Sequence, residues 1–386
     1  MKKKILIIDD SALMRRVLCD IINSDERFEV ADMAMDGIDG FNHICKNEYD
    51  AVVLDVYMPR MTGLEMLKEM QKSGVHANVL MASTTTGEGA KETLDALELG
   101  AIDFIKKPEN VADARHDEFK NRFLALLDIV CQSGGVQRHR ISSGSGAKTS
   151  TFTARYDVNF HNKGESNISK ETYSSFTPRA QGTIVKTRNH SMVSGKKIVA
   201  IASSTGGPKA LQQVIPKLPA NLDATVLLVQ HMPKGFTASL AERLNDLSNV
   251  KVTEAKEGDM IEKGHVYIAP GGKHLKLERH GSSYSITLSD EPSREGVKPC
   301  ANYMYESLIN SDFDEVTCAV LTGMGADGTA GIKALSEKKK TYVVAQDEET
   351  STVYGMPKAI AATGLVNSVV PLENVAEQIV KNVGVR

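Results

Sequence analysis

The sequence lacks any long apolar run, any large excess of one charge and any close pair of cysteines. No stretch approaches the ~20 apolar residues that a membrane span needs, so we predict no membrane insertion. Lys and Arg total 46 against 49 Asp and Glu, which excludes the broad basic surface of a nucleic-acid-binding protein. The five cysteines include no CxxC pair, and this predicts a reducing cytoplasm and no zinc site.

We also predict no export signal at the beginning of the sequence. The basic residues Met1–Lys4 are followed by only four apolar residues before Asp9 and Asp10, which predicts a strand. At ~150 residues per domain, 386 residues predict two or three domains. No internal repeat of ~20–50 residues is visible.

Residues 1–131 have the pattern of an open α/β sheet. Short β-branched runs alternate with amphipathic stretches, such as 12–23 with Leu13, Val17 and Ile21 on one face. Such alternation predicts parallel βαβ units. The five predicted strands are Lys4–Ile8, Phe28–Met33, Ala51–Asp55, Asn78–Ser83 and Ile102–Ile105.

Residues 132–195 are predicted to form a flexible linker. The segment between Ser133 and Ser194 contains 18 Ser and Thr and has no sustained apolar period. A small folded insert around 152–160 is the alternative.

Residues 196–386 return to an α/β pattern. Buried-strand runs at 197–202, 225–229, 316–322 and 341–345 are separated by helical stretches. The runs 265–269 and 273–278, joined by Pro270-Gly271-Gly272, predict an antiparallel hairpin at the sheet edge.

Three carboxylates follow strands of the first domain. Asp9, Asp10 and Asp55 lie at predicted carboxyl ends, where open α/β sheets place their sites. Because three clustered acids repel one another, they favour a hard cation such as Mg²⁺, beside which Asp55 could attack a phosphoryl donor. Ser83 and Lys107 fall at the ends of the next two strands. Taken singly, these residues are equally typical of helix caps and turns.

This set resembles the receiver domain of two-component response regulators. The resemblance implies a flavodoxin-like fold, Asp55 as phospho-acceptor, Ser83 and Phe104 as the switch pair and Lys107 as a pocket cation. It also implies Mg²⁺ held by Asp10, Asp55 and the Tyr57 carbonyl with help from Asp9. The matching segments are Asp9-Asp10-Ser11, Asp55 with Met58-Pro59-Arg60 and Gly63, Ser83, and Lys107-Pro108.

In the second domain, three strand ends carry Ser, His and Asp. Ser203 and Ser204 precede Thr-Gly-Gly, His231 follows the next strand, and Asp327 lies in a glycine-rich loop. Together they fit a nucleophile, a base and its orienting partner. Alone, the first turn equally suits a phosphate or dinucleotide site, His231 a structural role and Asp327 a helix cap. The turn after 197–202 carries no GxGxxG or GxxxxGK[ST] motif, and the second domain contains no GxSxG motif and no compact basic helix-turn-helix.

The second domain closely resembles the protein-glutamate methylesterases of bacterial chemotaxis. The resemblance implies Ser204 as nucleophile, His231 as general base, Asp327 as its partner and the Met324 N–H as an oxyanion donor. Ser203 stands where many relatives have Ala and is the rival nucleophile. The matching segments are Ser204-Thr205-Gly206-Gly207, Gln230-His231-Met232-Pro233 and Thr322-Gly323-Met324-Gly325-Ala326-Asp327-Gly328.

The two resemblances imply a phosphorylation-activated, cytoplasmic enzyme of chemotaxis. Such an enzyme hydrolyses glutamate methyl esters on the cytoplasmic helices of chemoreceptors, releases methanol without a cofactor, and deamidates receptor glutamines. In this family the receiver domain covers the esterase site until a chemotaxis histidine kinase phosphorylates it. The expected architecture is a parallel receiver, a linker and a doubly wound esterase domain with an edge hairpin, in a monomer. The alternatives are an inactive receptor adaptor and a nucleotide-dependent oxidoreductase.

Overall fold

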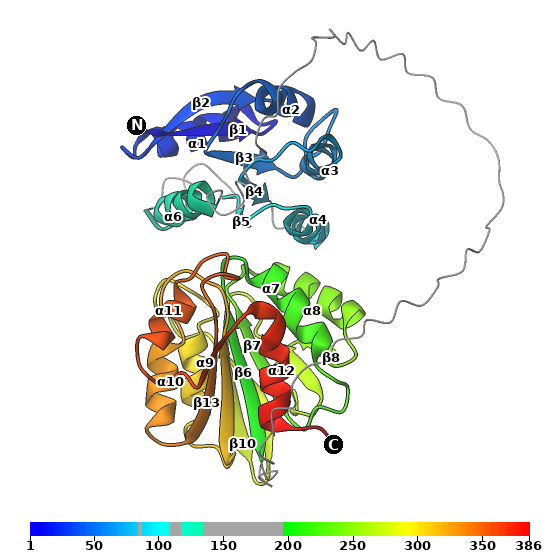
Figure 1. Cartoon of the computed structure of the whole chain (residues 1–386), viewed down its shortest axis with the longest axis vertical. Coiled ribbons are helices and arrows are strands. Elements are labelled where there is room, and N and C mark those ends of the chain that lie inside the picture. Colours follow the sequence, from blue (N-terminus) through cyan, green and yellow to red (C-terminus); the bar gives the residue numbers. More distant parts are fainter. Residues whose placement is uncertain (84–86, 109–116, 134–195) are drawn as a thin grey trace, which may run out of the picture. The chain divides into compact units, whose positions relative to one another are not determined.

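The computed structural model describes residues 1–83, 87–108, 117–133 and 196–386. Two large sheets organise these residues into an N-terminal and a C-terminal α/β domain (Figure 1). The predicted linker, 132–195, and its alternative insert around 152–160 lie outside the described residues, except that Gln132 and Ser133 belong to helix α6.

The N-terminal domain is built on a parallel five-stranded sheet in the order β2-β1-β3-β4-β5. Every residue of β3 and β4 is buried, as expected of apolar strands in a parallel sheet that is covered on both faces. The predicted receiver-type fold is therefore confirmed. Its elements are β1 (Lys3–Ile8), α1 (Ala12–Asn23), β2 (Phe28–Ala34), α2 (Gly37–Lys46), β3 (Ala51–Asp55), α3 (Gly63–Ser73), β4 (Val79–Ser83), α4 (Gly87–Glu98), β5 (Asp103–Lys106) and α6 (Asp117–Ser133).

Helix α1 has the predicted bounds but a different buried face. Val17 and Ile21 are buried, together with Leu18 and Ile22, whereas Leu13 is 60% exposed. Leu13 lies in the first turn, just after the N-cap Ser11, so it precedes the part of the helix that packs on the sheet.

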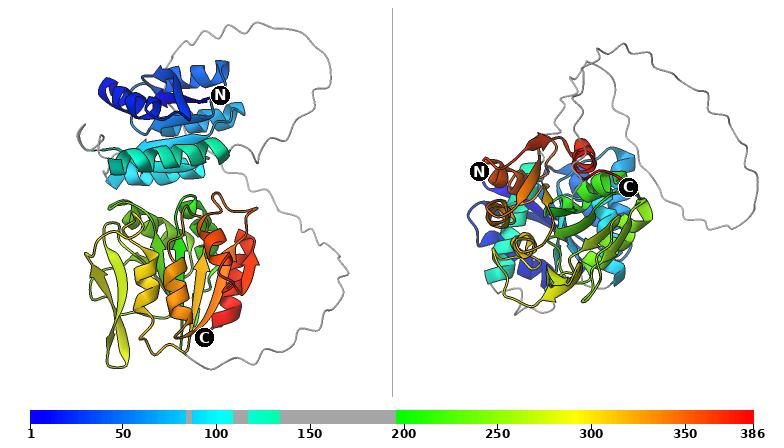
Figure 2. Two further views of the ribbon diagram at one scale, coloured as in Figure 1. Left: turned by 90° about the vertical axis from the view of Figure 1, so that its left-hand side faces the viewer. Right: turned by 90° about the horizontal axis from the view of Figure 1, so that it is seen from below.

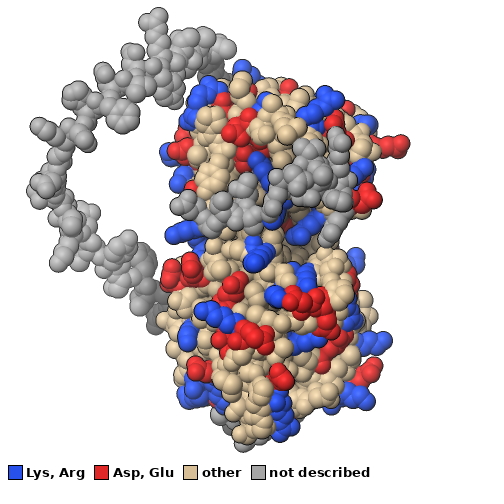
Figure 3. Space-filling model, turned by 180° about the vertical axis from the view of Figure 1, so that it is seen from behind, with Lys and Arg blue, Asp and Glu red and all other residues tan. Residues whose placement is uncertain are grey.

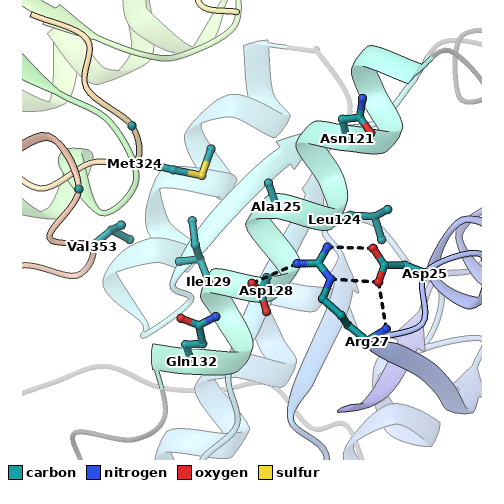
Figure 4. Close-up of a pocket in the computed structure, with 12 residues that line it drawn as sticks. Asp25, Arg27, Asn121, Leu124, Ala125, Asp128, Ile129, Gln132, Met324 and Val353 are labelled. Carbon is teal, nitrogen blue, oxygen red and sulfur yellow. Dashed lines mark hydrogen bonds and ion pairs between the residues drawn. The ribbon is translucent and has the colours of Figure 1, made fainter. Parts of the chain in front are cut away.

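Helix α6 is held to the sheet mainly by its apolar face, with a cluster of ion pairs at its rim. Phe123 is fully buried in the core beneath β1 and β3. Arg27 lies between Asp25 and Asp128 (Figure 4), at 2.8 and 3.2 Å from their carboxylates, and Lys3 contacts Asp128 at 2.9 Å. Because these pairs are partly exposed, we expect each to stabilise the domain by ~1 kcal/mol or less.

The C-terminal domain is built on a parallel seven-stranded sheet in the order β14-β13-β12-β6-β7-β9-β8. The predicted doubly wound α/β fold is thus confirmed. Its elements are β6 (Lys197–Ser203), α7 (Gly207–Val214), β7 (Thr225–Gln230), α8 (Phe236–Leu247), β8 (Lys251–Glu254), β9 (His265–Ile268), β10 (His274–His280), β11 (Ser283–Ser289), α9 (Ala301–Ser307), β12 (Glu315–Val320), α10 (Thr329–Ser336), β13 (Lys340–Gln346), α11 (Met356–Ala361), β14 (Ser368–Val370) and α12 (Leu372–Val383), with a 3₁₀ turn at Ile215–Lys217.

The central strand β6 is buried on both faces. Successive strand residues point to opposite sides of a sheet, and Val199 and Ile201 pack with α7, α8 and α12. Ile198 and Ala200 pack with α9, α10 and α11 on the other side, as the helices on both faces in Figure 2 show. Since β6 lies between β12 and β7, the loops that follow these three strands meet at one edge of the sheet.

An antiparallel hairpin is present, but the sequence-based prediction of its strands is wrong. β9 pairs in parallel with β7 and β8, and all four of its residues are buried. The hairpin is a separate two-stranded sheet of β10 and β11, in which His274 faces Ser289 and His280 faces Ser283. The stretch from Pro270 to Gly272 is therefore a crossing between two sheets and not a hairpin turn.

Charge is mixed on the surface drawn in Figure 3, where Lys and Arg side chains alternate with Asp and Glu. This mixture agrees with the formal net charge of −3. None of the helices in the described ranges is long and apolar enough to cross a membrane.

Candidate active site and acidic pocket

The loop after β6 separates the two adjacent serines into different environments. Ser203 is fully buried, and its hydroxyl donates a hydrogen bond to Gln230 Oε1 at 2.7 Å. Ser204 is partly exposed, and among the described residues its Oγ has no hydrogen-bond partner. Gln230 Nε2 in turn donates to the Ser204 carbonyl at 3.0 Å. This arrangement favours Ser204 as the nucleophile, with Ser203 as part of its support.

The two glycines after Thr205 fit the sharp turn from β6 into α7. Gly206 has a φ of +75°, a left-handed conformation that glycine adopts without strain. A Cβ on Gly207 would lie 2.0 Å from Gln230 Oε1. Only glycine at this position leaves room for the Gln230 side chain, which bonds both Ser203 and Ser204. The turn thereby places Ser204 beside the N-terminus of α7, which favours developing negative charge.

His231 and Asp327 come together from opposite sides of β6. His231 follows β7, Asp327 lies in the loop after β12, and His231 Nε2 is 2.7 Å from Asp327 Oδ2. The two side chains are only 6% and 3% exposed. With Nε2 bonded to the carboxylate, Nδ1 is the ring nitrogen left to accept a proton from a nucleophile.

Asp327 accepts an unusually large number of hydrogen bonds. Besides His231, the donors are the backbone N–H groups of Ala301 at 2.6 Å, Asn302 at 3.0 Å and Gly328 at 2.8 Å, and the Cys300 thiol at 3.0 Å. Burial alone would raise the pKa of Asp327, but the hydrogen bonds and charge of His231, with help from Cys300 and Ala301, lower it to about 2. The carboxylate therefore stays ionised.

Asp327 does not cap the helix that follows it. The N-cap of α10 is Gly328, and the N–H of Gly331 in the first turn donates to Asn302 Oδ1 at 2.7 Å and not to Asp327. The cap alternative from the sequence therefore does not account for this carboxylate.

The loop after β12 also approaches Ser204 directly. The Ser204 N–H donates to the Thr322 carbonyl at 3.0 Å, and the Thr322 hydroxyl donates to the Thr205 carbonyl at 2.9 Å. A Cβ on Gly323 would lie 2.7 Å from the Ser204 Cβ. Within the described parts of the chain, the Met324 N–H has no intramolecular acceptor, as an oxyanion donor requires.

The N-terminal domain brings the three predicted acids together at the ends of β1 and β3. Asp9, Asp10 and Asp55 each offer a carboxylate oxygen within 4.8 Å of the others. Lys107 Nζ contacts both Asp9 and Asp55 at 2.6 Å. An all-oxygen donor set of this charge fits Mg²⁺. Helix α1 is capped by Ser11, so Asp10 is not the cap of that helix.

Burial and the neighbouring lysine have opposite effects on the pKa of Asp55. Burial raises the pKa of Asp55 to about 6, while the Lys107 ammonium opposes the rise. The predicted switch residues Ser83 and Phe104 belong to neighbouring strands, β4 and β5. Ser83 is fully buried, with its Oγ 2.8 Å from the Thr93 hydroxyl of α4. Tyr57 lies two residues after Asp55 and is partly exposed, and its carbonyl stays a predicted ligand.

Several residues of both sites have no role assigned from the sequence. Gln230 and Thr322 stand inside the quoted motifs, but only their contacts show that they hold the Ser204 loop. Cys300 is distant in sequence from every motif and contacts Asp327. Thr93 is an ordinary helical residue in the sequence and meets Ser83 only in the fold.

The prediction of solvated histidines is partly wrong. In the sequence, His265 lies in the predicted hairpin, and His274 and His280 lie among charged residues, which predicts that these histidines are solvated. His280 is indeed exposed, but His265 is 5% exposed and His274 is fully buried. The physical reason is that β9 lies inside the large sheet and the start of β10 packs against the segment before α9.

Comparisons with known proteins agree with this geometry. Residues 199–379 match the family model described as CheB methylesterase, and residues 5–116 match the response regulator receiver domain. A Pyrococcus abyssi protein named protein-glutamate methylesterase/protein-glutamine glutaminase is 38% identical over 389 residues, covering 99% of this chain and 94% of that protein. A Vibrio cholerae protein of the same name, numbered 1, is 36% identical over 386 residues, covering 99% of each.

A solved structure is also similar to part of the chain. The crystal structure of the Thermotoga maritima CheB methylesterase catalytic domain is 39% identical and has a TM-score of 0.47. The match covers 49% of this chain and 99% of that one.

The fold and the two family matches define a response regulator whose output domain is an esterase with a parallel α/β sheet. More particularly, the chain belongs to the CheB methylesterase family, since relatives of that kind match it from end to end.

Proposed function

We propose that this protein is a serine hydrolase that demethylates glutamate methyl esters on chemoreceptors and deamidates receptor glutamines. The observation that carries the proposal is the 2.7 Å pair of His231 and Asp327 on the same sheet edge as the partly exposed Ser204. The names of the full-length relatives support the substrate class.

In the first half of the proposed reaction, Ser204 Oγ attacks the ester carbonyl. Nδ1 of His231 takes the hydroxyl proton while its Nε2–H stays on the ionised Asp327, which fixes the ring orientation. The oxyanion receives a hydrogen bond from the Met324 N–H, and one such donor contributes ~2.7–4 kcal/mol to transition-state stabilisation. His231 then protonates the leaving methoxide, methanol departs and an acyl-enzyme remains.

In the second half, His231 activates water to hydrolyse the acyl-enzyme. Water adds to the acyl carbon, its proton passes to His231, and Ser204 Oγ recovers that proton as the glutamate carboxylic acid is released. A primary amide presents the same carbonyl geometry, so the same steps convert a receptor glutamine to glutamate with loss of ammonia.

We further propose that phosphorylation of Asp55 controls this activity. Asp10, Asp55 and the Tyr57 carbonyl would hold Mg²⁺ with help from Asp9, and the cation would neutralise charge on an incoming phosphoryl group. Lys107 lies close enough to Asp55 to contact the transferred group. Phosphorylation adds ~1.5–2 negative charges, enough to bias a switch through Ser83 and Phe104 and to relieve the receiver's cover of the esterase site.

The proposed partners follow from these two reactions. The phosphoryl donor is a chemotaxis histidine kinase, and the substrate lies on the cytoplasmic helices of methylated receptors. We expect the protein to act in the cytoplasm as a monomer, with residues 132–195 linking the domains 1–131 and 196–386.

Methanol release from methylated receptor membranes tests the hydrolytic proposal. We expect Ser204→Ala to abolish release, because the neighbouring hydroxyl residues Ser203 and Thr205 are buried. Ser203→Ala is the matched control, and it should keep release within about tenfold, since Ser203 acts only through one hydrogen bond to Gln230. Equal release by wild type and Ser204→Ala would refute a serine hydrolase, and loss only in Ser203→Ala would identify the rival nucleophile.

A further inference from the structure

A buried thiol contacts the carboxylate of the candidate catalytic pair. Cys300 is fully buried just before α9, and its Sγ lies 3.0 Å from Asp327 Oδ1. This oxygen is not the one that contacts His231, which bonds Oδ2. The thiol and the imidazole therefore contact different oxygens of the same carboxylate.

The chemistry of the site makes this thiol a hydrogen-bond donor. Burial, with the nearby charge of Asp327, raises the pKa of Cys300 to about 12, so the sulfur keeps its proton. Asp327 is ionised and can only accept. The S–H···O⁻ contact thus joins the N–H groups of Asn302 and Gly328 in holding Oδ1, while Oδ2 contacts His231.

The position of Cys300 is itself fixed by a buried histidine. The Cys300 N–H donates to His274 Nδ1 at 3.1 Å, and His274 Nε2 lies 3.2 Å from the Pro292 carbonyl. Since Nδ1 accepts this hydrogen bond, it carries no hydrogen, so Nε2 carries the N–H and donates a hydrogen bond to that carbonyl. Both ring nitrogens are therefore used, and His274 connects β10 to the segment that carries Cys300.

We propose that Cys300 is a positioning residue of the hydrolytic site, which orients Asp327 toward His231 by donating its thiol proton to Oδ1. The inference rests on the proposed roles of Asp327 and His231. It extends them to a residue that no motif in the sequence identifies.

A positioning role for Cys300 predicts a change in the pH profile, which a residue that only fills space in the core would not cause. Loss of the thiol donor leaves more negative charge on Asp327 to attract the proton shared with His231, so the imidazole is protonated more easily. The titratable side chains around Asp327 are His231, Cys300 and Tyr305, and Tyr305 stays neutral because burial raises its pKa. The acid limb of kcat/KM against pH should then move to higher pH.

The experiment compares full-length Cys300→Ala, Cys300→Ser and Cys318→Ala in the methanol-release assay. Cys318 is the matched control because it is equally buried, in β12, and its hydrogen bond is only a 4.0 Å contact with the Val316 carbonyl. We expect Cys300→Ala to lose about tenfold in kcat and to shift the acid limb up by roughly half a pH unit. Cys300→Ser restores a donor and should stay within about threefold of wild type with no pH shift.

The outcomes separate this inference from the function on which it rests. Cys318→Ala should keep the wild-type pH profile. If Cys300→Ala and Cys300→Ser behave alike, or if Cys318→Ala shows the same shift, the positioning role is wrong. If wild type releases no more methanol than Ser204→Ala, the proposed function itself fails, whichever way the cysteine variants behave.

Discussion

The five hydrogen bonds that the Asp327 carboxylate accepts hold this side chain in one orientation. Three donors approach Asp327 Oδ1, while Oδ2 receives one backbone N–H and the His231 ring. The side chain has little freedom to rotate, so the position of His231 follows from the position of Asp327. The backbone donors Ala301 and Asn302 come from the start of α9 and make this arrangement part of the fold.

We predict that Asp327→Asn loses activity by on the order of 10³- to 10⁴-fold. An amide NH₂ in place of either oxygen would face a backbone N–H, of Ala301 or of Asn302, and its donor would also favour the wrong His231 tautomer. The initial rate of methanol release measures the loss, and urea unfolding checks that the variant is folded. A folded variant with more than a tenth of the wild-type rate would contradict the role of Asp327.

At the residue scale, the sequence was sufficient to predict which residue types meet at the strand ends. The family resemblance favoured Ser204 over Ser203, but the physical difference between them, the burial of Ser203 and its hydrogen bond to Gln230, is visible only in the structure. The prediction for His274 failed for a related reason. Its neighbours along the chain are charged, but its neighbours in space are a backbone N–H and a carbonyl.

The strands β8 and β9 show how an element fixes the behaviour of a side chain. His265 begins β9, stacks on Tyr267 with ring centroids 3.8 Å apart, and places its Nε2 2.9 Å from the Thr253 hydroxyl. Burial, followed by the charge of Lys251, lowers the pKa of His265 from 6.5 to about 4. The folded protein thus keeps this imidazole neutral in a range where the unfolded chain takes up a proton.

We predict that the free energy of unfolding falls as the pH drops from about 6.5 to about 4, and that His265→Gln reduces this fall. The sign follows because the unfolded state binds more protons in that window. Urea unfolding at several pH values measures it, with His280→Gln as the control, since His280 is exposed. A His265→Gln profile parallel to that of wild type would contradict the account.

Elements with buried, apolar runs were predictable and those defined by their pairing were not. β3 has the predicted bounds, and the strands that carry Ser204 and His231 begin at the predicted residues. The short strands β8 and β14 went unpredicted because they have few apolar residues and lie at the sheet edges. The hairpin was assigned to the wrong strands because nothing local in the sequence shows that β9 pairs in parallel.

At the scale of the whole molecule, both parallel sheets place their reactive side chains at the same edge, although the chemistry differs. In each, reactive side chains follow adjacent strands at the carboxyl edge, with acids and a lysine in one and Ser, His and Asp in the other. Alternation of strands and helices in the sequence predicts both sheets. The alternation of strands and helices in each domain does not predict how one site controls the other, because that control depends on both domains together.

We predict that a small phosphodonor with Mg²⁺ raises methanol release by wild type, and that Asp55→Asn shows no such rise. The amide cannot form the acyl phosphate, and the loss of one acid weakens the Mg²⁺ site. Asp39→Asn, which changes a partly exposed carboxylate on α2, is the control and should keep the response. Chelation of Mg²⁺ should suppress the rise in wild type. A full response in Asp55→Asn would refute control through this residue.

The identity of the nucleophile can be measured without any receptor. A fluorophosphonate that reacts with activated serines should form one covalent adduct on the wild-type chain, which peptide mass spectrometry should place on Ser204. Ser204→Ala should remain unlabelled under the same conditions. An adduct on Ser203, or equal labelling of wild type and Ser204→Ala, would contradict the account of a Ser204–His231–Asp327 site.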